Sequence, residues 1–185
     1  MITVSDLSLN YSGTPLFSHV DLQFLRGNCY GIIGANGAGK STFLKILSGD
    51  LEPSTGEVSI LPNTRMSVLK QNQNAYDAYN VMDTVIMGNQ RLYDIGKEKE
   101  ALYAKEEMTD EDGMLACQLE EEYAELGGWE AESDASRILQ GLGIGTDLHD
   151  NDMATLDARL KVKVLLAQAL FGSPDLLMII WRTIR

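Results

Sequence analysis

The sequence predicts an α/β fold, and two patterns near the N-terminus support this class. Apolar and polar residues alternate over 7–11 and again over 20–24, as they do in half-buried strands. A short apolar run at 29–33 then leads through a glycine-rich loop into a helix expected at 40–48. Strand–loop–helix units of this kind favour a partly parallel sheet that is covered by helices.

The remaining elements follow from turns, helix caps and apolar spacing. They are expected as strands at 57–61, 66–69 and 176–180, a helix start at Asn80, and an amphipathic helix at 158–171. Residues 90–140 are helical and polar, with a capping box at Thr109 and Asp112 and a break at Gly127. We therefore predict that 1–185 form one domain, in which a helical insertion at 90–140 interrupts an α/β core.

Composition indicates a cytoplasmic protein. The chain has 185 residues, of which 44% are hydrophobic and 23% charged, and no apolar run is long enough to span a membrane. The N-terminus lacks the basic segment of a signal peptide. Cys29 and Cys117 are not spaced for a metal site and are expected to stay reduced, while His19 and His149 are expected in surface or turn positions.

Negative charge is concentrated in one segment. Of the 27 acidic residues, twelve lie in 106–134, which has no lysine or arginine, so the rest of the chain has 15 residues of each sign. Such a distribution does not attract phosphate backbones. Two interpretations stay open for the segment: a solvated helix face, or a docking surface for something basic.

The glycine-rich loop fits the phosphate-binding pattern G-x-x-x-x-G-K-[ST] at every fixed position, as GANGAGKS at 34–41. Glycines let backbone N–H groups converge on phosphate oxygens, and the following helix directs its positive end at the same anion. The lysine reaches the β- and γ-phosphates, and the serine hydroxyl reaches Mg²⁺. We therefore assign nucleotide binding to Gly34, Asn36, Gly37, Ala38, Gly39, Lys40, Ser41 and Thr42.

Residues 31–49 (GIIGANGAGKSTFLKILSG) strongly resemble the ATP-binding cassette (ABC) ATPases, which have a P-loop NTPase-type fold. The resemblance implies that ATP and Mg²⁺ are bound. It matches Tyr11 to the aromatic residue that stacks on adenine, and Gln71 to the glutamine that helps Ser41 to hold Mg²⁺ and senses the γ-phosphate. The alternatives are an ordinary strand aromatic for Tyr11 and a solvent-facing loop residue for Gln71.

Three phrases further along the chain resemble the arm region of the ABC-F group, in the first of that group's two cassettes. They are NVMDTVIMGN at 80–89, LYAKEEMTDEDG at 102–113 and GGWEAESDASRILQGLG at 127–143. The resemblance implies a cytoplasmic protein without transmembrane domains that acts on or near the ribosome. It also implies a second cassette as the partner that completes the ATP site. The negative charge of the acidic segment is unfavourable for direct contact with RNA, which requires lysine and arginine.

Two departures from the family pattern argue against hydrolysis. The signature Leu-Ser-Gly-Gly-Gln is replaced by LDARL at 156–160, where Asp157 brings a like charge toward phosphate unless Arg159 acts as a donor. Ile180 and Trp181 stand where the family has the Asp and Glu that hold Mg²⁺ and polarise the attacking water. We therefore expect an incomplete nucleotide-binding domain without catalytic residues.

Several interpretations of the chain stay open at this point. The leading one is a truncated ABC-F protein that binds ATP with little or no hydrolysis, and whose last residues result from a frameshift. An alternative is the nucleotide-binding subunit of a membrane transporter, which shares the P-loop, Tyr11 and Gln71. A further one is a non-functional pseudogene product.

Overall fold

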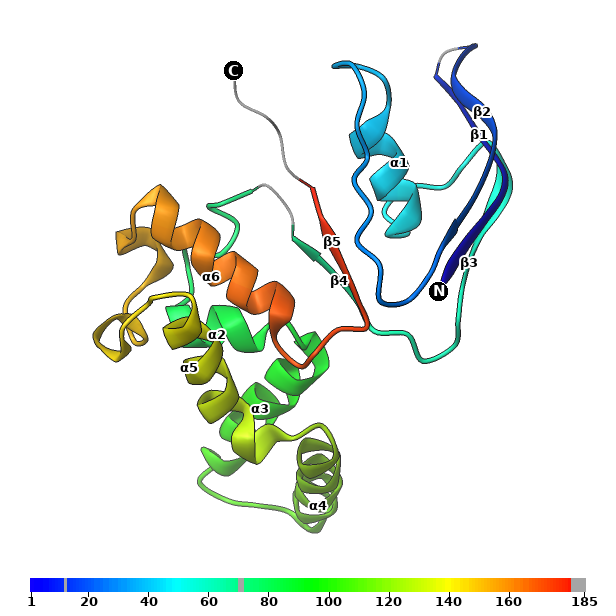
Figure 1. Cartoon of the computed structure of the whole chain (residues 1–185). Coiled ribbons are helices and arrows are strands. Elements are labelled where there is room, and N and C mark those ends of the chain that lie inside the picture. Colours follow the sequence, from blue (N-terminus) through cyan, green and yellow to red (C-terminus); the bar gives the residue numbers. More distant parts are fainter. Residues whose placement is uncertain (12, 70–71, 181–185) are drawn as a thin grey trace. The chain divides into compact units, whose positions relative to one another are not determined.

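The computed structural model describes residues 1–11, 13–69 and 72–180 (Figure 1). The chain divides into two compact units: Met1–Val68 together with Met178–Arg185, and Leu69–Leu177. The predicted helical segment 90–140 lies within the second unit, which we call the helical unit. The first unit contains the glycine-rich loop, and we call it the loop unit.

A three-stranded antiparallel sheet with the order β2-β1-β3 forms the loop unit's framework. Its strands are β1 (Ile2–Tyr11), β2 (Thr14–Phe24) and β3 (Thr55–Ile60). Along β1 the buried residues change from Ile2 and Val4 to Leu7 and Leu9, so their spacing shifts by one residue. The pairing with β2 is irregular between Val4 and Leu7, and Asp6 there has a φ of 49°. This bulge keeps both pairs of apolar side chains on the covered face.

Helix α1 (Lys40–Leu47) packs against this sheet through Phe43, Ile46 and Leu47, which are buried. The rings of Phe43 and Phe17 meet edge to face, with their centroids 5.7 Å apart. Gly49 ends the helix with a φ of 78°, and its N–H donates to the Ile46 carbonyl oxygen. Both the helix and its glycine cap are as predicted.

The predicted strand at Cys29–Ile33 is wrong. These residues have no regular secondary structure, and the Ile33 side chain is 94% exposed. A strand needs a neighbour that accepts and donates its backbone hydrogen bonds. Within the described residues, the ladders of the loop unit's sheet join only β1, β2 and β3. An apolar run shows that a segment is suited to burial, but it does not supply the neighbouring strand.

Strands β4 (Met66–Leu69) and β5 (Leu176–Ile179) form a separate two-stranded sheet. Both confirm the predicted positions. Only one face of β5 is buried, because Met178 is buried while Leu177 and Ile179 are exposed.

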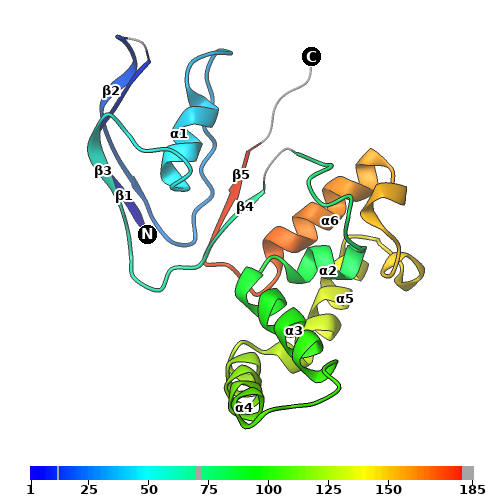
Figure 2. The same cartoon turned by 180° about the vertical axis from the view of Figure 1, so that it is seen from behind.

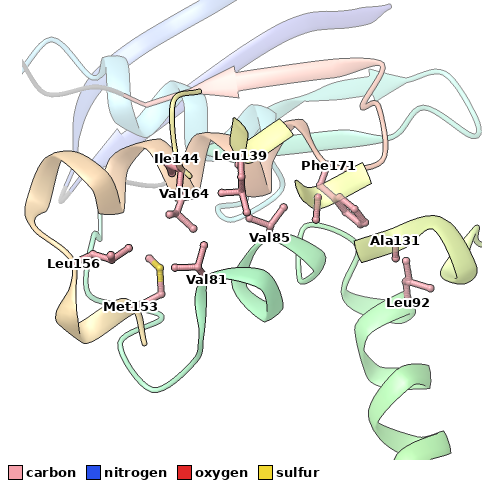
Figure 3. Packing of buried hydrophobic residues seen from close by; sticks show 12 residues of the cluster. Val81, Val85, Leu92, Ala131, Leu139, Ile144, Met153, Leu156, Val164 and Phe171 are labelled. Atoms are coloured by element: carbon pink, nitrogen blue, oxygen red, sulfur yellow. The ribbon is translucent and has the colours of Figure 1, made fainter. Parts of the chain in front are cut away.

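The helical unit is built around three helices, α2 (Val81–Ile86), α5 (Ala131–Gly141) and α6 (Ala158–Leu170). They lie side by side in Figures 1 and 2. Their contact surfaces form one core with two short 3-10 turns, Thr146–Leu148 and Met153–Thr155, between α5 and α6. Figure 3 shows this core, whose labelled members include Val81, Val85, Leu139, Ile144, Met153, Val164 and Phe171.

A second pair of helices extends the unit. They are α3 (Gln90–Tyr103) and α4 (Asp110–Glu125), and a 3-10 turn, η1 (Gly128–Glu130), connects α4 to α5. Ile95, Leu102, Ala116 and Leu119 form a small apolar core between the two helices. The predicted capping box is confirmed, since the Thr109 and Asp112 side chains each accept from the other's backbone N–H.

The two histidines differ in environment. His19 is exposed, as predicted, and its Nδ1 lies 2.6 Å from an oxygen of Asp6. His149 lies in a turn but is only 4% exposed, with Nε2 at 3.5 Å from the Ile144 carbonyl oxygen. His149 thus occupies a turn position, as expected, but it is buried and not on the surface.

Candidate functional site

The predicted phosphate loop is a tight turn that opens directly into α1. Gly37 and Gly39 have φ values of 86° and 85°, in the left-handed region that side chains other than glycine rarely adopt. A Cβ atom on Gly39 would lie 2.9 Å from Cγ of Leu16. Glycine at position 39 therefore allows the turn both its backbone conformation and its close approach to β2.

Lys40 folds back over the loop. Its Nζ donates to the carbonyl oxygens of Gly34 and Ala35, each at 2.7 Å. The ammonium group thus lies inside the turn, in a position to exchange carbonyl oxygens for the oxygens of a bound anion. Since the first turn of α1 has no acidic residue, no carboxylate there competes for this cation.

Ser41 and Thr42 follow in the first turn of α1. The Ser41 side chain is exposed and that of Thr42 is half-buried. A hydroxyl in this position fits Mg²⁺ that is also held by phosphate oxygens, because Mg²⁺ takes oxygen ligands and keeps several waters. No group of three His, Cys, Asp or Glu side chains in the described residues is arranged to hold a metal by itself.

Tyr11 lies at the end of β1, and its side chain is 66% exposed. It pairs with Thr14 on β2, two residues before Leu16, which borders the Gly39 turn. The β1–β2 hairpin therefore brings Tyr11 near the chain segment that touches the loop. An exposed ring leaves a free π face on which a base can stack.

Comparison with known proteins identifies the family. A model of the family described as "ABC transporter" matches residues 17–179. The chain belongs to the ABC transporter family. It is an ABC ATP-binding domain, and the match includes the loop, α1 and the whole helical unit. Within residues 1–11, 13–69 and 72–180, no helix combines the length and apolar character required to cross a membrane.

The curated relatives are longer than this chain. It is 56% identical to the uncharacterized ABC transporter ATP-binding protein YkpA of Bacillus subtilis, over 97% of this chain and 33% of YkpA. It is 45% identical to the probable ATP-binding protein YbiT of Escherichia coli O157:H7, over 97% of this chain and 34% of YbiT. A more distant relative, 29% identical over 96% of this chain and 25% of its own length, is ABC transporter F family member 4 of Arabidopsis thaliana. The chain thus spans about a third of the length of the first two.

Solved structures confirm the fold. The ATP-binding subunit of an ABC transporter matches 97% of this chain and 65% of its own, with a TM-score of 0.68 and 21% identity. The predicted α/β class, a P-loop NTPase-type ABC nucleotide-binding domain, is therefore correct.

Two residues that the sequence analysis considers for the nucleotide site, Gln71 and Trp181, lie outside the described residues. Ile180 is described, and it follows β5 as a half-buried aliphatic residue. An aliphatic side chain can neither coordinate a cation nor accept a proton.

The segment 156–160, where the sequence analysis expects the family's signature, includes the N-cap and the first residues of α6. Asp157 caps this helix, and its Oδ1 accepts from the Leu160 N–H at 2.8 Å. Leu156 is buried and Arg159 is exposed. The carboxylate therefore already occupies one of the N–H groups at the helix start that an anion would otherwise use.

Sequence reasoning missed a buried cation in α6. The Lys161 side chain is 8% exposed, and its Nζ donates to Asp77 at 2.5 Å and to Asn74 at 3.0 Å. The sequence did contain a signal for this contact, because a lysine inside the apolar stretch of a helix requires a polar or charged partner. What the sequence did not reveal was that the partner lies 84 residues earlier.

Proposed function

We propose that this ABC domain binds Mg-ATP through its loop, with the residues from Gly34 to Thr42 around the phosphates and Tyr11 on the adenine. The observation that carries the proposal is the position of the Lys40 Nζ, held by two loop carbonyl oxygens at the start of α1. In this assignment, Ser41 and Gln71 hold the Mg²⁺ that accompanies the nucleotide. When bound, that ion neutralises charge on the β- and γ-phosphates.

A thermal shift experiment with a matched control tests this proposal. At a ligand concentration about 100 times Kd, binding adds about 2.7 kcal/mol of stability, so Mg-ATP is expected to raise Tm clearly. Lys40→Ala removes most of that shift, because it deletes the cation inside the turn. Lys45→Ala leaves it unchanged, since Lys45 is an exposed residue of the same helix. Equal shifts in the two variants would show that the loop is not the nucleotide site.

We further propose that the domain is the first cassette of a cytoplasmic ABC-F protein that acts at the ribosome as a translation factor. The ABC-F phrases over 80–143 support this, as does the likeness to the F family member of Arabidopsis thaliana. In this assignment residues 1–185 belong to one nucleotide-binding domain, with 90–140 as its arm insertion. A second cassette completes the ATP site, as in other ABC domains. Cosedimentation of the intact protein with ribosomes, in a manner that depends on ATP, is the expected result.

Hydrolysis at this site is expected to be at background. The family's two carboxylate positions fall on Ile180 and Trp181, and neither residue can hold a metal or polarise water. Steady-state phosphate release from the purified chain measures this directly. Turnover that Lys40→Ala abolishes would mean that the carboxylates come from elsewhere.

The second candidate is the nucleotide-binding subunit of a transporter. The description of the matched family and the likeness to the ATP-binding subunit of an ABC transporter favour it. The two functions separate in one fractionation experiment on cells. The transporter subunit stays with membranes after ribosomes are removed, whereas the ABC-F protein follows the ribosomes.

A further inference from the structure

The carboxylates of α4 fall into two sets. One set faces α3 and the preceding loop and is paired: Asp112 with Lys105 at 2.5 Å, Glu120 with Lys99 at 2.8 Å, and Glu122 with Arg91 at 2.5 Å. The other set is exposed, and its side chains form no hydrogen bond or ion pair within the described residues: Asp110, Glu111, Glu121 and Glu125. Packing against α3 therefore explains only the first set.

Local helix physics favours the carboxylates at the start of α4 but not those near its end. Asp110 and Glu111 lie in the first turn, where negative charge is stabilising. Glu121 and Glu125 lie toward the C-terminus, where negative charge opposes the helix dipole, and no basic residue is present in the last turn. They are also spaced i, i+4, a destabilising arrangement for like charges. The fold of this unit therefore gains nothing from Glu121 and Glu125.

The same face of α4 carries an exposed apolar side chain. Met114 is 66% exposed. It lies one turn after Asp110 and two turns before Glu121, opposite the buried Ala116 and Leu119. Cys117, one turn after Met114, is an exposed free cysteine. We call Asp110, Glu111, Met114, Cys117, Glu121 and Glu125 the α4 face.

We propose that the α4 face docks a lysine- or arginine-rich segment of a partner protein, with an apolar side chain of that segment covering Met114. Charge complementarity selects this occupant, because four unpaired carboxylates surround one apolar contact. A nucleic acid is repelled by the same charges. A second copy of this chain, with a net charge of −12, is repelled as well. In Figures 1 and 2, α4 lies at the end of the helical unit away from α6, so that a partner can approach it.

A synthetic amphipathic peptide of lysine and leucine is the probe, and the two cysteines supply the readout. Cys117 lies on the α4 face, whereas Cys29 is an exposed free cysteine in the loop unit. Addition of the peptide is expected to slow alkylation of Cys117 without slowing that of Cys29. A matched aspartate–leucine peptide is expected to slow neither.

A pair of charge-reversal variants separates docking from general attraction. Glu121→Lys with Glu125→Lys is expected to weaken peptide binding about tenfold, because two attractive pairs become repulsive. These changes also favour the helix dipole, so a loss of binding cannot be attributed to unfolding of α4. Glu52→Lys with Glu57→Lys changes the net charge equally at exposed positions of the loop unit and is expected to leave binding unchanged.

Further outcomes decide the proposal. Equal weakening by both double variants, or equal protection of both cysteines, would overturn it, because either result means attraction to the whole acidic chain. Binding that is insensitive to Met114→Gln would overturn the apolar part. Lys40→Ala is expected to leave peptide binding unchanged, so this test stands apart from the assignment of the nucleotide site.

Discussion

Replacement of Lys161 by methionine is expected to lower the free energy of unfolding of the helical unit by about 2 kcal/mol. Lys161 connects α6 to the segment before α2, since its Nζ contacts Asp77 and Asn74. Methionine keeps most of the apolar stem and its packing. The change therefore removes the charge and its hydrogen bonds with little loss of buried surface.

The magnitude follows from the exposure of the two partners. Removal of one member of a fully buried ion pair costs about 3–5 kcal/mol, because the other charge stays buried and unpaired. Here the Lys161 side chain is 8% exposed but that of Asp77 is 37% exposed, so water can solvate the abandoned carboxylate. This lowers the cost to about 2 kcal/mol, which includes the lost hydrogen bond to Asn74.

Thermal unfolding, monitored by far-UV circular dichroism, measures this loss of stability, because most helices of the chain lie in this unit. A loss of about 2 kcal/mol corresponds to a decrease in Tm of about 4–8 °C for a chain of this size. Lys163→Met is the control, since Lys163 lies on the same helix, is half-buried and forms no ion pair within the described residues. A Tm for Lys161→Met equal to that of the control would refute the reasoning. So would the absence of coupling with Asp77→Asn in a double-mutant cycle.

Three further predictions concern α4 and Gly88, which follows the C-cap of α2. The hydrogen bond from Lys105, together with those from Thr109, lowers the pKa of Asp112 from 3.8 to about 2. The stability that this carboxylate adds is therefore complete above about pH 4 and is lost as the pH falls toward 2. Circular dichroism is expected to show a smaller acid-induced loss of stability in Asp112→Asn than in the native chain. Gly88→Ala is expected to decrease Tm strongly, because its Cβ would lie too close to the Gln168 carbonyl oxygen, whereas Gly113→Ala, with open space around it, is expected to stabilise α4.

Helix ends were the features most fully predictable from the sequence. Asn80 accepts from the Asp83 N–H, Thr109 and Asp112 form their capping box, and Gly49 ends α1. Each of these signals lies within about four residues of the group that it satisfies. The partner of a cap is thus fixed by spacing along the chain, and tertiary contacts are not needed to find it.

Contacts between distant residues were the part that the sequence left undetermined. The apolar run at Cys29–Ile33 is as suited to a strand as that of β5, yet only β5 has a hydrogen-bonding neighbour within the described residues. Likewise, the sequence around Lys161 did not indicate that its partner is Asp77. The type of a residue, apolar or charged, indicates which environment it requires. Which other residue provides that environment depends on the fold of the whole chain.

The loop before α1 shows that the phosphate-binding geometry is local. Its left-handed turns at Gly37 and Gly39 and the contacts of Lys40 with Gly34 and Ala35 are formed although Cys29–Ile33 is not a strand. The turn needs only its glycines, the first turn of α1, and the approach of β2 at Leu16. Because none of these contributions comes from a preceding strand, the strength of nucleotide binding is expected to depend on the Gly39 turn. Gly39→Ala should therefore remove most of the Mg-ATP shift, as Lys40→Ala does, because its Cβ would be forced against Leu16.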